Sequence, residues 1–188
     1  MESLDKLLNN VAWDKEPAEQ IETLKQFDNL SKEQINYLVS PHFVKSQEAG
    51  IAIKYIGLTK LTNNVDELLI FLQDMNWPAA GHVSDLLTSM GRIIFPSVKK
   101  VFREGNDGLW NYWILLGVIR NFDNENIELL KPDLLALIRI ADKDGACIEA
   151  LKILKRILND NEYSEQFNYL LDRFQGEDYW LADLHDDS

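Results

Sequence analysis

Few residues of this sequence combine side-chain types and spacings that could support chemistry. The three histidines, His42, His82 and His185, lie far apart along the chain and lack the short spacings of zinc ligands. Residues 142–145 read Asp-Lys-Asp-Gly, which resembles the start of a calcium loop, but the glycine comes too early and the later ligands are missing. The sequence also lacks a glycine-rich phosphate loop, a zinc-protease helix motif and a nucleophile elbow. It therefore predicts no catalytic residue, no metal site and no cofactor.

Aromatic and polar side chains in two stretches are the best candidates for binding a partner. They are Asp74, Asn76, Trp77 and His82 in the first stretch, and Trp110, Asn111 and Trp113 in the second. Tryptophan is enriched at binding hot spots. Trp110 and Trp113 are three residues apart, a spacing that places both on one side of a helix. We therefore predict that these residues line a groove that anchors a partner.

The same residues also have a structural interpretation, which stays open beside the first. Tryptophans can fill the space between helices while their indole N–H groups bond to turn carbonyls, and the apolar neighbours of Trp113 favour this role there. Asp74 and Asn76 are typical turn residues that bond to nearby backbone groups. His82 lies at the start of a predicted helix, and a histidine in such a position is more often hydrated or hydrogen-bonded than functional. A catalytic carboxylate at Asp74 would lack an identifiable partner acid or base.

Apolar residues recur at helical spacing along most of the chain, and no segment alternates as a half-buried strand would. Ser31 and Gln34 form a capping-box pattern. The pattern predicts helices over residues 4–11, 17–27, 31–39, 46–62, 65–72, 78–90, 93–102, 109–122, 127–141, 146–158 and 163–174. Pro78 is expected to begin its helix, the helix over 109–122 to be the most buried, and that over 127–141 to bend or restart at Pro132.

A shift of 36 residues overlays part of the chain on its continuation. Trp77 then falls on Trp113, Gly81 on Gly117, and Pro96 on Pro132. Such a period is typical of stacked helical repeats. We therefore predict an all-α, HEAT-like α-solenoid in which antiparallel helix pairs form a right-handed superhelix. It would be a single domain with an N-terminal cap over 1–43, about four helix pairs over 44–175 and an acidic tail over 176–188. An irregular helical bundle is the alternative.

The charge balance restricts the class of partner. The 188-residue chain has 31 acidic and 19 basic side chains, a net charge of −12. This field repels nucleic acids and anionic membranes and attracts basic protein surfaces, although acidity can also serve solubility alone. The single cysteine, Cys147, excludes an intrachain disulfide, is expected to be a small core residue and suits a reducing compartment. With neither a signal peptide nor a long apolar run, the sequence predicts a cytoplasmic protein.

The run Leu72-Gln73-Asp74-Met75-Asn76-Trp77-Pro78 and the later Trp110-Asn111-Tyr112-Trp113 together resemble an uncharacterised bacterial family of HEAT-like domains of unknown function. The resemblance extends over about residues 65–158. It implies a helical-repeat fold, and it implies no activity, cofactor or catalytic residue. Some small acidic bacterial proteins of this general kind resemble immunity proteins that neutralise toxins, which is an analogy at the level of the fold.

Three hypotheses follow for function. The leading one is a non-enzymatic scaffold that binds a protein or peptide, including an immunity-type inhibitor of a basic toxin or enzyme whose association is steered by charge. The second is a helical-repeat enzyme that uses the Asp74 carboxylate between Trp77 and Trp110, as if to hold a flipped base, although the net charge opposes nucleic-acid binding. The third is a structural subunit of an assembly. The sequence does not indicate an oligomeric state.

Overall fold

The described part of the chain is all helical. The computed structural model describes residues 4–12, 14–104, 107–140 and 143–177 together with 179 and 182, and no strand occurs among them. The chain divides into two compact units, Met1–Ile94 and Phe95–Ser188. The single domain stays a prediction, and most of the acidic tail lies outside the described residues, as does His185. No helix in the described part is both long and apolar enough to cross a bilayer.

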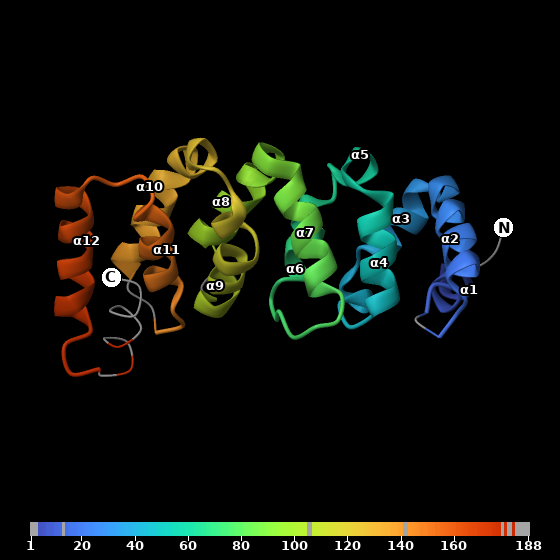
Figure 1. Ribbon diagram of the computed structural model, residues 1–188, viewed down its shortest axis with the longest axis horizontal. Coiled ribbons are helices and arrows are strands. Elements are labelled where there is room, and N and C mark those ends of the chain that lie inside the picture. The colour runs from blue at the N-terminus through green and yellow to red at the C-terminus, as the bar shows by residue number, and fades with distance from the viewer. Residues whose placement is uncertain are drawn as a thin grey trace. The chain divides into compact units, whose positions relative to one another are not determined.

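The described part of the first unit contains seven α-helices, coloured blue to green in Figure 1. They are α1 (Leu4–Asn9), α2 (Pro17–Gln26), α3 (Lys32–Leu38), α4 (Gln47–Ile56), α5 (Leu58–Leu61), α6 (Val65–Ile70) and α7 (Ala80–Met90), with short 3-10 helices at Phe27–Asn29, Pro41–Phe43 and Gly91–Ile94. The predicted capping box is confirmed at α3. Ser31 Oγ accepts from the Gln34 backbone N–H at 3.3 Å, and the Gln34 side chain accepts from the Ser31 N–H at 2.9 Å.

The core of the first unit forms where α4 packs against α7 and α1. Gly50 lies in α4 and is buried against Ala79, the residue that precedes α7. A methyl group built at Gly50 would lie 2.8 Å from the Ala79 Cα, closer than side-chain carbons pack. The absence of a side chain at Gly50 therefore allows α4 to approach the backbone before α7 this closely.

Five α-helices with assigned bounds lie in the described residues of the second unit, coloured green-yellow to red-orange in Figure 1. They are α8 (Phe95–Glu104), α9 (Gly108–Gly117), α10 (Asn124–Ile140), α11 (Ala146–Leu154) and α12 (Asp160–Arg173), with a 3-10 helix, η4, at Ile119–Asn121. Helix α11 packs against α9, α10 and α12, and eight of its nine residues are buried. Among these is Cys147, so its predicted place in the core is confirmed.

Several predicted helix limits are wrong for local reasons. Gly57 has a φ of 72°, a left-handed value that favours glycine, and it separates α4 from α5 within the predicted helix 46–62. Pro78 lies in a turn, and α7 begins two residues later, at Ala80. The helix predicted over 109–122 is observed as α9, which already ends at Gly117. It was also expected to be the most buried helix, but α11 is more completely buried. Helix α10 runs through Pro132, so the predicted restart is wrong there, whereas the predicted bend stays a prediction.

The 36-residue overlay is also wrong as a guide to equivalent positions. Gly81 is near the start of α7, whereas Gly117 is the last residue of α9, and Trp77 lies in a turn whereas Trp113 lies within a helix. Side-chain bonds between elements join residues at several separations within each unit. Examples are Lys54 to Asp85 and Lys131 to Glu162, each separated by 31 residues, and Asn64 to Asn36, separated by 28.

Candidate functional site

The first predicted stretch forms a turn. Asp74 Oδ1 accepts hydrogen bonds from both the backbone N–H and the side-chain amide of Asn76, each at 2.9 Å. The Trp77 N–H donates to the Asp74 carbonyl at 3.0 Å. The interpretation of Asp74 and Asn76 as turn residues is therefore confirmed.

His82 and Trp77 lie on either side of the start of α7 and are both half-buried. His82 is the third residue of the helix, and its ring faces α4. The Cδ2 atom would be 3.0 Å from a methyl group built at Gly50. This packing gives His82 a structural contact within the first unit.

The second predicted stretch belongs to α9. Asp107 Oδ1 accepts from the Trp110 backbone N–H at 3.0 Å and caps the helix. Trp110 and Trp113 are half-buried, and the Trp113 ring meets Tyr112 edge-on with centroids 4.9 Å apart.

Two buried polar atoms of α9 form no hydrogen bond within the described part of the chain. Asn111 is 4% exposed, and its Oδ1 atom accepts no hydrogen bond from any described residue. Trp113 Nε1 is buried and donates to none. The prediction that the indole N–H of Trp113 bonds to a turn carbonyl is therefore wrong for the described part of the chain. The seven predicted residues divide between the two units, so neither unit contains the complete set.

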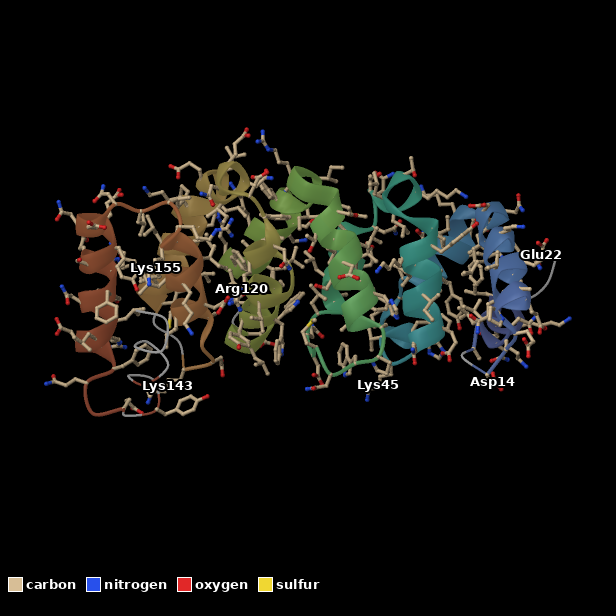
Figure 2. All side chains as sticks on the ribbon, viewed as in Figure 1. Asp14, Glu22, Lys45, Arg120, Lys143 and Lys155 are labelled. Carbon is tan, nitrogen blue, oxygen red and sulfur yellow. The ribbon has the colours of Figure 1, made fainter. Side chains whose placement is uncertain are left out.

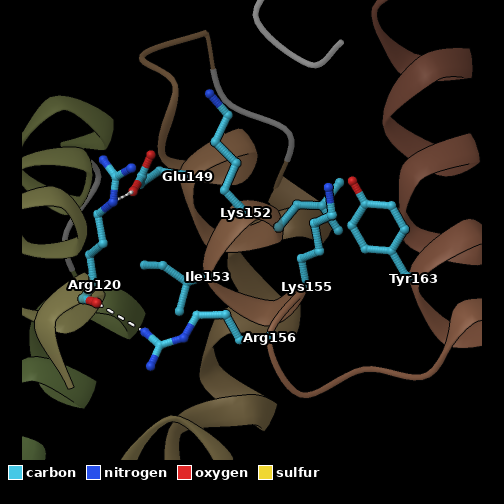
Figure 3. A pocket seen from close by; sticks show the side chains of 8 residues that line it. Arg120, Glu149, Lys152, Ile153, Lys155, Arg156 and Tyr163 are labelled. Carbon is cyan, nitrogen blue, oxygen red and sulfur yellow. Dashed lines mark hydrogen bonds and ion pairs between the residues drawn. The ribbon is translucent and has the colours of Figure 1, made fainter. Parts of the chain in front are cut away.

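A different feature in the second unit combines charge with a cavity. It is a pocket of about 250 Å³ beside α11, which we call the basic pocket (Figure 3). Four of its side chains are cationic and one is a carboxylate. The lining residues are Arg120, Glu149, Leu151, Lys152, Ile153, Lys155, Arg156 and Tyr163. The described lining of the pocket thus carries three net positive charges in a chain whose net charge is −12.

Arg156 fixes one wall of the basic pocket. Its Nη1 group donates to the Arg120 carbonyl at 3.0 Å, and its Nη2 group donates to the Phe122 carbonyl at 2.7 Å. These bonds tie the residue range 120–122, which includes the end of η4, to the chain just after α11. Bonds from a cation to carbonyls are stronger than bonds between neutral groups. The backbone that carries Arg120 is therefore held in place relative to α11.

Glu149 orients the Arg120 side chain. The Arg120 Nε atom lies 3.9 Å from Glu149 Oε1, and the side chains are 56% and 6% exposed, respectively. Because this pair is long and one partner is solvated, its contribution to stability is small. The pair instead sets the orientation of the Arg120 side chain, since its Nε atom faces the buried Glu149 carboxylate (Figure 3).

Lys155 and Tyr163 form the opposite side of the basic pocket. The Lys155 ammonium lies 5.7 Å from the centroid of the Tyr163 ring, within the range of a cation–π contact. Lys152 lies three residues earlier on α11, and Figure 3 shows its side chain extending on the same side as Glu149. Figure 2 marks Arg120 and Lys155 within the second unit.

The cations of the basic pocket also have a structural role. Lys152, Lys155 and Arg156 lie at the C-terminal end of α11, where positive charge interacts favourably with the helix dipole. This role does not require Arg120, which comes from η4 and adds its charge to the same cavity.

Sequence reasoning missed the basic pocket, although one signal was visible. Residues 152–156 contain three cations and no acid, a local reversal of sign in an acidic chain. Arg120 and Glu149 are 29 residues apart, and no sequence pattern places them together.

Comparison with known proteins gives a family and no activity. The family model described as Domain of unknown function (DUF5071) matches residues 47–166. This segment includes all eight described residues that line the basic pocket. Neither curated proteins nor solved structures give a significant match.

Proposed function

Since the chain belongs to the family described as Domain of unknown function (DUF5071), we propose a function from its own residues: a non-enzymatic protein-binding module. In this proposal the helices form HEAT-like stacked pairs, and the basic pocket holds an anionic group of a protein or peptide partner. The observation that carries the proposal is the basic pocket itself, with four cations around one cavity in an acidic chain. Multiple side-chain bonds at separations near 30 residues support the stacked pairs.

The contrast between the basic pocket and the acidic excess of the whole chain suggests the kind of partner. Screening limits the field of exposed charges to about 8 Å at physiological ionic strength, so the pocket acts only on groups close to it. The rest of the surface carries the acidic excess of the chain and attracts a basic molecule within the same range. A partner that satisfies both is basic overall and presents one anionic group at contact. Basic enzymes and toxins are such partners, and binding them is what an inhibitor or immunity protein would do.

The pocket chemistry favours binding over catalysis. Its described lining contains one carboxylate, Glu149, which is 6% exposed and faces Arg120. A general acid–base reaction needs a proton-transfer group that reaches the substrate. The Asp74 carboxylate, which we considered as a catalytic group, accepts two hydrogen bonds within its own turn.

Fluorescence anisotropy with three labelled peptides of one length tests the proposal. The peptides share the same basic flanks and carry an acidic, a basic or a neutral side chain at their centre, and the proteins are the wild type, Lys152→Glu and the matched control Lys25→Glu. Lys25 is 61% exposed and lies in the first unit. We expect the acidic peptide to bind best, and Lys152→Glu to weaken it about tenfold while Lys25→Glu changes it less than about twofold. If no peptide binds, or if Lys152→Glu leaves binding unchanged, the proposal is wrong.

A further inference from the structure

We propose that the anionic group held in the basic pocket is a phosphomonoester dianion carried by a side chain of the partner. This inference rests on the proposed function and specifies the chemistry of the same site. It follows from the charge of the lining, the chemistry of its donor groups and the size of the pocket, which are taken in turn.

The charge count favours a dianion over a carboxylate. Among the described lining residues, four cations and Glu149 leave three net positive charges. A bound carboxylate would neutralise one of these. A phosphomonoester carries about −1.5 to −2 charge at pH 7 and therefore compensates more of the excess. Mutual repulsion among the cations decreases accordingly.

The donors in the basic pocket match the three acceptor oxygens of a phosphate. Arg120 directs Nε toward Glu149, so the two Nη groups of its fork are the edge that a ligand can meet. Lys152 contributes an ammonium on the same side of the pocket. Arg156 has a different role, because both of its Nη groups already donate to backbone carbonyls. It adds charge and holds the Arg120 backbone.

The walls and the volume indicate a phosphorylated side chain. Ile153 and Tyr163 supply apolar surface beside the cations, suited to the carbon atoms that bear the phosphate. Pockets for drug-sized ligands usually measure about 300–1,000 Å³. At about 250 Å³ the basic pocket is smaller, so it suits one side chain better than a whole cofactor.

The pH dependence of binding distinguishes the two anions. The second pKa of a phosphomonoester is about 6, so its charge increases between pH 5 and pH 7. A glutamate side chain is already ionised across this range. The titratable and charged side chains that line the basic pocket are Arg120, Glu149, Lys152, Lys155, Arg156 and Tyr163. No histidine is among these described residues, so none of the lining groups has a usual pKa between 5 and 7.

The experiment uses one labelled peptide sequence with phosphoserine, glutamate or serine at its centre, measured by anisotropy with the full chain. Inorganic phosphate serves as a competitor. We expect the phosphoserine peptide to bind about tenfold more tightly than the glutamate peptide at pH 7, because charge-assisted bonds to phosphate are stronger and more numerous. Arg120→Ala and Lys152→Ala should each remove most of this difference, whereas the control Lys25→Ala should retain it. Binding of the phosphoserine peptide alone should weaken from pH 7 to pH 5.

Each result decides between the two proposals. Equal binding of the phosphoserine and glutamate peptides overturns the phosphomonoester and leaves the anion-binding module standing. If neither peptide binds, both proposals are wrong. Binding of inorganic phosphate without either peptide also overturns both, because the ligand would then be a free anion. A phosphoserine preference that survives Arg120→Ala and Lys152→Ala overturns the assignment to this pocket.

Discussion

Substituting alanine for glycine should change the free energy of unfolding in opposite directions at two helical positions of the first unit. Replacing a helical glycine by alanine normally stabilises a protein by up to about 1 kcal/mol, because alanine restricts the unfolded chain and favours the helix. Gly81 lies in the first turn of α7, and a methyl group there would meet nothing within 4 Å. We therefore expect Gly81→Ala to stabilise the fold by about 0.5 kcal/mol.

At Gly50, close packing should make the same substitution destabilising. Its added Cβ would lie 2.8 Å from the Ala79 Cα and 3.0 Å from His82 Cδ2. The backbone atom cannot move aside without separating α4 from the start of α7. Overpacking of this kind costs about 1–3 kcal/mol. Because a backbone atom is involved, we take the upper part of this range. After the gain from the higher helix propensity of alanine, the free energy of unfolding should fall by about 2 kcal/mol.

Urea unfolding followed by far-ultraviolet circular dichroism measures both changes. An unfolding free energy that is lower for Gly50→Ala and higher for Gly81→Ala, with similar m-values, is the expected result. In thermal scans the Gly50→Ala melting temperature should fall by about 4–8 °C, at about 2–4 °C per kcal/mol for a chain of this size. A Gly50→Ala protein as stable as the wild type would refute the close packing of α4 against Ala79.

Other predictions concern the second unit. Asp133 is 4% exposed and lies 2.7 Å from Arg103 and 3.2 Å from Lys99. Removing both cations by Lys99→Met and Arg103→Met should cost about 3–5 kcal/mol because it leaves a buried carboxylate unpaired, whereas Asp133→Asn should cost about 1–2 kcal/mol. Equal losses in urea unfolding would contradict this. Asn159→Ala should cost about 1 kcal/mol by removing the cap of α12, and a thermal melt unchanged from the wild type would contradict it. The Asn159 backbone N–H, and then Lys131, lower the pKa of Glu162. This stabilisation is present above the usual glutamate pKa of about 4.3 and is lost as pH falls through the lower folded value. Glu162→Gln should therefore flatten the acid side of a stability–pH curve, and parallel curves would contradict the cap.

The accuracy of sequence reasoning varied with the distance over which each feature is determined. The capping box of Ser31 and Gln34 was predicted because its hydrogen bonds connect residues three apart. The turn at Asp74 and Asn76 was predicted for the same reason. The end of α4 at Gly57 was missed because an apolar pattern continues past it, and the pattern does not reveal a positive φ.

The predicted groove of Trp77, Trp110 and Trp113 stays a prediction, because it depends on contacts that spacing does not specify. Tryptophan spacing correctly placed Trp110 and Trp113 on one helix, yet spacing could not show that Asn111 would be buried beside them. The overlay of Trp77 on Trp113 matched residue types, although one lies in a turn and the other within a helix. Identical residue types therefore did not indicate equivalent positions.

The helical class, several helix starts and the net charge follow from the amino-acid sequence, because these depend on composition or on neighbours within about one helical turn. Where opposite charges meet and which cations share a cavity depend on the packing of the helices. Arg120 approaches Glu149, 29 residues away, because η4 is held against the end of α11 by Arg156. Contacts at that separation depend on how whole helices pack, and the pattern of residues along one helix does not specify its neighbour.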